Sequence, residues 1–194
     1  MINALIAGII AYLLGSVTFG MIVPKFMGTS ADVRNEGSGN VGATNVLRTR
    51  GKLQGALVLV GDLLKGALAA WIGLSLAGPV GGGVAGLCAM AGHCFPLYYG
   101  FKGGKGVATG AGIVCVILPE AMLFLVPLFL VAVGLSRMVS LGSVAAALAL
   151  ILCLPVCRPP APVVVFCAVA AALVIWKHRA NIKRILAGTE NKLW

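Results

Sequence analysis

The chain has 194 residues, of which 60% are hydrophobic and only 10% are charged, and its formal net charge is +10. Soluble domains carry about 25% charged residues, so this composition excludes an ordinary soluble protein and indicates a membrane protein. The basic residues lie between and after the apolar runs, which argues against a nucleic-acid-binding face. We therefore expect an all-α polytopic membrane protein that forms one domain over residues 1–194.

Seven apolar segments follow one another along the chain, and we predict about seven transmembrane helices from them. The segments are Ile2–Val23, Leu53–Leu76, Val80–Tyr98, Gly106–Leu118, Ala121–Leu135, Leu141–Val156 and Ala161–Trp176. The fourth to sixth are short for full spans, so tilted or partly re-entrant helices are expected there. Gly81–Gly83 and Arg158–Pro160 are predicted to form short external turns.

The basic residues predict a side of the membrane for each loop. With the N-terminus outside, 13 of the 15 Lys and Arg residues face the cytoplasm. These are Lys25, Arg34, Arg48, Arg50, Lys52, Lys102, Lys105, Arg137, Lys177, Arg179, Lys183, Arg184 and Lys192. Because cytoplasmic loops are enriched in Lys and Arg, we predict an external N-terminus and a cytoplasmic C-terminus.

Two ionisable residues fall inside the second apolar segment. Asp62 and Lys65 are three residues apart, so they share one face of a helix and are able to pair. Ionisable groups within a span are candidates for function, and a self-neutralising structural ion pair is the alternative.

The predicted cytoplasmic side carries two loops suited to binding an anion. In the first, Ser38, Asn40, Thr44 and Asn45 supply neutral donors, and Arg48 supplies a planar fork suited to phosphate. The second contains the run Lys102, Gly103, Gly104 and Lys105, which leads into an apolar helix whose N-terminus favours an anion. Simple turns and contacts with anionic headgroups are the alternatives.

A third polar segment follows the last apolar run. His178 and Asn181 lie three residues apart and would project from one face of a continuing helix. We interpret them as groups that position the substrate or handle a proton. His93 either contributes to the site or stabilises a helix C-terminus, and Ser38 and Ser143 either bind phosphate or cap a helix.

These segments, in this order, resemble the three motifs of the bacterial acyl-phosphate:glycerol-3-phosphate acyltransferase family. The matching stretches are GSGNVGATNVLR (37–48), GHCFPLYYGFKGGKGVAT (92–109) and KHRANIKRILAGTENK (177–192), with GDLLKG (61–66) and SRMVSLGS (136–143) in support. The resemblance implies a seven-helix enzyme of the cell inner membrane with its site on the cytoplasmic side. It would transfer an acyl group from a long-chain acyl phosphate to the sn-1 hydroxyl of glycerol 3-phosphate. The product is lysophosphatidic acid, in the first step of phospholipid synthesis.

The residues agree with that chemistry. An acyl phosphate is already activated, so positioning and charge stabilisation are enough to transfer its acyl group. Acyltransferases that use soluble donors are associated with a His-x-x-x-x-Asp pattern, whose His and Asp act as a base pair. Neither His93 nor His178 is followed by Asp at that spacing, and this absence favours a different mechanism. We predict that His178 and Asn181 are catalytic. The predicted substrate-binding residues are Ser38, Asn40, Thr44, Asn45, Arg48, His93, Lys102, Gly103, Gly104, Lys105 and Ser143. The five carboxylates are scattered, so neither a metal site nor a cofactor is expected. We expect membrane lipid, and not nucleic acid, to be a partner of the protein. The main alternative function is that of an anion transporter.

Overall fold

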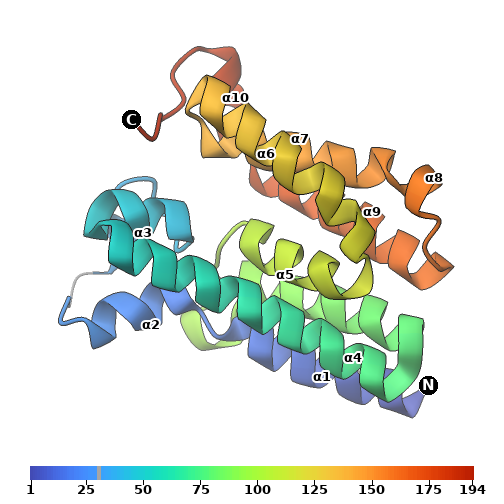
Figure 1. The fold of residues 1–194 in the computed structure, drawn as a ribbon. Coiled ribbons are helices and arrows are strands. Elements are labelled where there is room, and N and C mark those ends of the chain that lie inside the picture. Colours follow the sequence, from blue (N-terminus) through green and yellow to red (C-terminus); the bar gives the residue numbers. More distant parts are fainter. Residues whose placement is uncertain (30–31) are drawn as a thin grey trace.

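The computed structural model describes residues 1–29 and 32–194 (Figure 1). Its α-helices are α1 (Ile2–Ser16), α2 (Phe19–Phe26), α3 (Ala43–Arg50), α4 (Lys52–Cys94), α5 (Val107–Ile117), α6 (Met122–Ser136), α7 (Val139–Leu152), α8 (Leu154–Cys157), α9 (Ala161–Lys177) and α10 (Arg179–Leu186). Short 3-10 turns are η1 (Val33–Asn35), η2 (Leu97–Tyr99) and η3 (Pro119–Ala121). No strand occurs within the described ranges, so the predicted all-α class is confirmed.

The second and third predicted segments form α4, which folds back on itself. Ala77 and Gly78 leave the helical conformation, and Gly78 adopts a positive φ of 57° immediately before Pro79. The two limbs then pack closely, because a Cβ on Gly81 would lie 2.0 Å from the carbonyl oxygen of Gly73. The prediction of an external turn at Gly81–Gly83 is therefore wrong. These glycines belong to the second limb, where they permit close helix packing, and the chain turns at Ala77–Gly78 instead.

The first predicted segment is broken into two helices. α1 ends at Ser16, and α2 begins at Phe19 with a bend of 42°. The break frees the carbonyl group of Val17, which accepts a hydrogen bond of 2.6 Å from Lys65 Nζ. This long-range contact stabilises a break that local sequence did not indicate.

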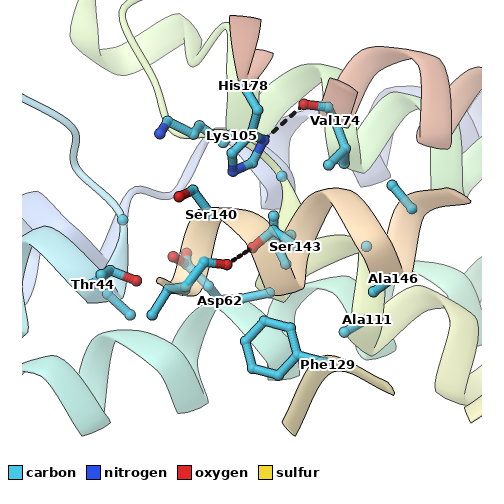
Figure 2. A pocket seen from close by; sticks show the side chains of 18 of the residues that line it. Thr44, Asp62, Lys105, Ala111, Phe129, Ser140, Ser143, Ala146, Val174 and His178 are labelled. Carbon is cyan, nitrogen blue, oxygen red and sulfur yellow. Dashed lines mark hydrogen bonds between the residues drawn. The ribbon is translucent and has the colours of Figure 1, made fainter. Parts of the chain in front are cut away.

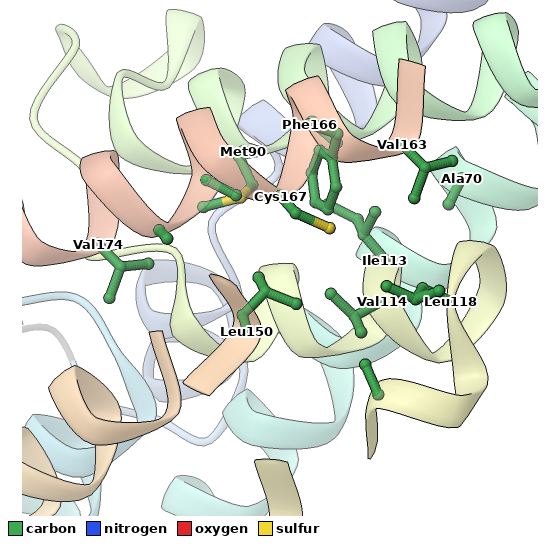
Figure 3. Packing of buried hydrophobic residues seen from close by; sticks show 14 of the residues in the cluster. Ala70, Met90, Ile113, Val114, Leu118, Leu150, Val163, Phe166, Cys167 and Val174 are labelled. Atoms are coloured by element: carbon green, nitrogen blue, oxygen red, sulfur yellow. The ribbon is translucent and has the colours of Figure 1, made fainter. Parts of the chain in front are cut away.

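The core is built largely from small residues on α1, α4, α5 and α9. Gly112 of α5 lies against Leu63 of α4 so closely that an added Cβ would be 2.0 Å from the Leu63 carbonyl oxygen. Phe166 of α9 and Ile113 of α5 fill the space over Gly86 of α4. Figure 3 shows this packing, with Leu150 of α7 facing the same cluster.

The helices form two packing groups that α9 connects. α1 and α5 pack on α4, whereas α6 packs chiefly on α7, and α9 contacts both α4 and α7. The N- and C-termini lie at opposite ends of the bundle, and α3 and α10 lie at the C-terminal end (Figure 1). We call this end, formed by α3, α10 and the C-terminal segment, the polar end.

Two helical stretches are long and apolar enough to cross a membrane, namely Lys52–Tyr99 and Pro119–Ser136. The bent pairs α1–α2 and α9–α10 raise the number to four, while α5 and α7 are shorter apolar helices. A seven-helix topology thus stays a prediction.

Candidate active site

A cavity of about 540 Å³ runs from the polar end into the apolar interior. Polar side chains line its mouth, and side chains of α5, α6, α7 and α9 line its depth. Figure 2 shows Lys105, His178 and Ser140 on one side of the hollow and Ala111 and Ala146 on the other. The cavity therefore suits a ligand with an anionic head and an apolar tail.

Asn45 organises the loop that precedes α3. Its Oδ1 accepts hydrogen bonds from the backbone N–H of Ser38 at 2.8 Å and from Ser38 Oγ at 3.2 Å. Its Nδ2 donates to the carbonyl oxygens of Val33 and Glu36 at 3.1 and 3.0 Å. Asn45 is only 2% exposed, so its amide positions Ser38 at the cavity mouth while its own polar atoms are occupied by the loop.

The remaining predicted residues of this segment are Asn40, which precedes α3, and Thr44 and Arg48, which lie on it. Asn40 Oδ1 accepts a hydrogen bond of 2.8 Å from the backbone N–H of Gly42, the residue that caps the helix. Thr44 and Arg48 are four residues apart, so they lie on the same helix face, and both line the cavity. Arg48 Nη2 donates to the carbonyl oxygen of Asn191 at 3.0 Å, which brings the C-terminal segment to the mouth.

The glycines of the second loop pack against His93. The Gly104 N–H donates to the His93 carbonyl oxygen at 3.0 Å. A Cβ on Gly104 would meet His93 Nε2, and one on Gly103 would meet the His93 carbonyl oxygen, each at 2.1 Å. These glycines therefore shape the loop without lining the cavity. Lys102 is exposed outside it, whereas Lys105 lines it.

Lys105 belongs to a hydrogen-bonded network centred on Glu190. Lys105 Nζ donates to Asn181 Oδ1 at 2.5 Å, and Asn181 Nδ2 donates to Glu190 Oε1 at 2.6 Å. Ser140 Oγ donates to the same oxygen at 2.8 Å, and Arg184 Nε donates to Glu190 Oε2 at 2.7 Å. α7, α10, the second loop and the C-terminal segment are thereby joined at one carboxylate.

The network changes the proton affinity of two groups. Burial lowers the pKa of Lys105 to about 8, with further lowering by Arg184 and Arg48 that the charge of Glu190 opposes. For Glu190, burial acts to raise the pKa, but hydrogen bonds from Asn181, Ser140 and Arg184 hold it below its ordinary value. At neutral pH the mouth thus combines a charged lysine and two arginines with the carboxylate of Glu190.

His178 lies at the bend of 57° between α9 and α10. Its Nδ1 is 2.8 Å from the Val174 carbonyl oxygen (Figure 2). A carbonyl oxygen only accepts, so Nδ1 carries the proton and Nε2 of the neutral ring is left as an acceptor. Ser143 donates to the Val139 carbonyl oxygen at 2.8 Å and retains its lone pairs for a ligand.

A buried ion-pair cluster lies behind the mouth. Lys65 Nζ is 2.8 Å from Asp62 Oδ1, which is 3.6 Å from His93 Nδ1. The predicted pairing of Asp62 and Lys65 is confirmed. Lys65 also donates to the Val17 carbonyl, and this bond favours the structural interpretation of the pair, although Asp62 and His93 reach the cavity wall.

Most of the predicted residues meet at this cavity. Those that line it are Ser38, Asn40, Thr44, Asn45, Arg48, His93, Lys105, Ser143, His178 and Asn181. Lys102, Gly103 and Gly104 do not line it.

Sequence reasoning missed Glu190, Ser140 and Arg184 as members of the site. All three lie within stretches of the motifs quoted above, but nothing in their spacing reveals that one carboxylate accepts hydrogen bonds from both α7 and α10.

The chain is similar to known proteins over nearly its whole length. The family model described as glycerol-3-phosphate acyltransferase matches residues 5–188. Glycerol-3-phosphate acyltransferase 2 of Moorella thermoacetica is 46% identical over 189 residues, which are 97% of each chain. Glycerol-3-phosphate acyltransferase of Aquifex aeolicus is 45% identical over 196 residues, covering 98% of this chain and 99% of that protein.

Two solved structures are also similar to this chain over nearly its whole length. The glycerol 3-phosphate form of PlsY (YgiH), an integral membrane glycerol 3-phosphate acyltransferase, matches with a TM-score of 0.92 at 44% identity. Its lysophosphatidic acid form matches with a TM-score of 0.90 at 42% identity. Each match covers 97% of this chain and 94% of the other.

Proposed function

Because this chain belongs to the family of integral membrane glycerol-3-phosphate acyltransferases, we propose that its acyl donor is a long-chain acyl phosphate. In this reaction the sn-1 oxygen of glycerol 3-phosphate bonds to the acyl carbonyl carbon, and the bond from that carbon to the phosphate oxygen breaks. The hydroxyl proton leaves with the phosphate, so the products are lysophosphatidic acid and hydrogen phosphate.

The observation that carries the proposal is the two-part character of the cavity. Its mouth gathers Arg48, Lys105 and Arg184, which suit two phosphate-bearing substrates, and its depth is apolar, which suits an acyl chain. A transporter would need polar groups along a path across the membrane, whereas here they gather at one end of the bundle.

We assign roles to the residues from their contacts. Arg48 and Lys105 hold phosphate groups, with Ser38, Asn40 and Thr44 as neutral donors around them. Asn181 and His178 act where the carbonyl carbon is attacked, since Asn181 orients Lys105 and His178 offers an unprotonated Nε2. Fixed donors and charges at the reacting centre stabilise the charge that develops in the transition state. Phosphate is a good leaving group, so the reaction does not require a strong general base.

The proposed setting is the cell inner membrane, with the N-terminus outside and the polar end in the cytoplasm. The distribution of Lys and Arg supports this orientation. Glycerol 3-phosphate is water-soluble, and a cytoplasmic mouth would admit it directly. The donor and the product would share the surrounding lipid.

The test supplies purified protein with glycerol 3-phosphate and one of two donors, palmitoyl phosphate or palmitoyl-CoA. We expect lysophosphatidic acid from the acyl phosphate and none from the thioester. Efficient turnover of palmitoyl-CoA without turnover of palmitoyl phosphate would contradict the proposed donor. The Asn181→Ala variant, checked for an unchanged thermal unfolding temperature, controls for a contaminating acyltransferase.

A further inference from the structure

The apolar part of the cavity is closed at its far end and open at one side. Leu150, Phe166 and Val114 close the far end, and each is at most 6% exposed. On the side between α5 and α6, Cys115 and Val126 line the same cavity and are nevertheless exposed on the outer surface of the bundle, Val126 by 42%. Side chains that belong both to a cavity wall and to the outer surface mark an opening.

The packing of α5 and α6 explains this opening. α5 packs chiefly on α4, and α6 packs chiefly on α7, so the two helices contact each other little. They are joined only through η3 (Figure 1). Leu123 and Leu130 of α6 are 75% and 60% exposed, and this apolar surface indicates that the opening faces lipid.

The depth of the opening matches the reach of a lipid chain. Val107, near the cavity mouth, and Cys115 are eight residues apart on α5, which corresponds to about 12 Å along a helix axis. One leaflet contributes about 15 Å of a hydrocarbon core of about 30 Å. The opening therefore lies about 12 Å from the cavity mouth, a distance that falls within the depth of one leaflet.

We infer that the acyl tail of the donor and of the product leaves the cavity between α5 and α6 and lies in the bilayer beyond. The inference rests on the proposed function, and the acyl tail is chosen as occupant because one continuous cavity joins this opening to the phosphate-binding mouth. The protein then holds the head and the first part of the chain, while lipid accommodates the rest. Long chains of different lengths should be used with similar efficiency.

The first experiment blocks the opening with a bulky side chain. Val126→Trp should lower kcat/KM for palmitoyl phosphate at least tenfold and leave butyryl phosphate, whose chain is too short to reach the opening, unchanged. Leu130→Trp is the matched control, because Leu130 is exposed one turn away on α6 but does not line the cavity. Equal effects of Val126→Trp on both donors, or no effect on either, would overturn the inference.

The second experiment follows the tail directly and needs no turnover. A palmitoyl phosphonate with a diazirine at its terminal carbon is bound in phospholipid vesicles and irradiated. We expect cross-links to surrounding lipid and to residues around Cys115 and Val126. Cross-links confined to Leu150 and Phe166 would show that the tail ends inside the cavity. If the phosphonate cross-links as expected but wild-type protein does not use palmitoyl phosphate, the proposed donor fails while the opening stands.

Discussion

Replacing Glu190 with glutamine removes one charge while keeping the size of the side chain. The carboxylate accepts hydrogen bonds from Ser140, Asn181 and Arg184, all of which are donors. A glutamine amide has one accepting oxygen, so its NH₂ group must face one of these donors whichever way it turns. A hydrogen bond to a charged group contributes about 1.5–3 kcal/mol. The side chain of Arg184 is 37% exposed and regains water when unpaired, so we expect Glu190→Gln to lower the free energy of unfolding by about 2 kcal/mol.

The same change should disturb catalysis through Asn181. With a weaker acceptor for its Nδ2, the Asn181 amide is free to rotate, and its Oδ1 no longer holds Lys105 in place. Loss of one charge-assisted hydrogen bond in the transition state corresponds to a factor of about 10–100 in rate. We therefore expect kcat/KM for glycerol 3-phosphate to fall by about this factor.

The assay combines thermal unfolding in detergent with steady-state kinetics well below the unfolding temperature. Glu120→Gln is the matched control, since Glu120 is an exposed carboxylate in η3, outside the cavity wall. It should leave both measurements unchanged. If Glu190→Gln also matched the wild type in unfolding temperature and in kcat/KM, the argument that this carboxylate organises the site would be refuted.

Four further changes test other contacts. Lys105 attracts phosphate only when it is protonated, and its pKa is about 8. The kcat/KM for glycerol 3-phosphate should therefore be highest below pH 8 and decline as the pH rises through that value. Lys105→Arg should remove the decline, and a wild-type profile that is flat to pH 9 would contradict this role. Arg48→Lys keeps the charge but loses the planar fork, so its KM for glycerol 3-phosphate should rise with little change in unfolding temperature, and an unchanged KM would argue against phosphate binding there. Asn181→Ala removes the acceptor that holds Lys105 in place, so kcat should fall by about 10²–10³, as when one fixed group that stabilises the transition state is lost, and near-normal turnover would show that Asn181 does not position Lys105 for catalysis. Gly112→Ala places a methyl group against the Leu63 carbonyl, so overpacking should destabilise the protein by about 1–3 kcal/mol, and an unshifted unfolding temperature would show that α5 moves freely on α4.

The apolar helices were predictable because each depends on local composition. The segments predicted for α5, α6 and α9 agree with the structure to within one residue at either end. The break after α1 was not predictable, since it depends on Lys65 reaching the Val17 carbonyl from 48 residues away. The glycines at Gly81–Gly83 were misinterpreted for a similar reason. A glycine run predicts a turn locally, and only the partner limb reveals that these residues permit close packing.

The sequence indicated which segments form the site, but not which hydrogen bonds hold those segments together. Arg48, Lys105 and Asn181 carry chemistry that identifies them individually, and all three line the cavity. Asn45 was predicted to contact substrate, yet its amide is occupied by the loop it supports. Glu190 was overlooked because a single carboxylate in a basic segment has no distinctive spacing. Its importance comes from three donors, one on α7 and two on α10, and such convergence is a property of the fold.

The Asp62–Lys65 pair also bears on how α4 enters the membrane during biosynthesis. On scales from insertion experiments, a charged residue at the centre of a membrane helix costs about 2.5–3.5 kcal/mol. Because the two residues are three positions apart, the pair of 2.8 Å needs no other helix and can form as soon as the helix does. The segment can thus be inserted in a neutralised form before the rest of the bundle exists. The bond from Lys65 to Val17 then depends on α1 arriving alongside, so the same lysine first eases insertion and later fixes one helix against another.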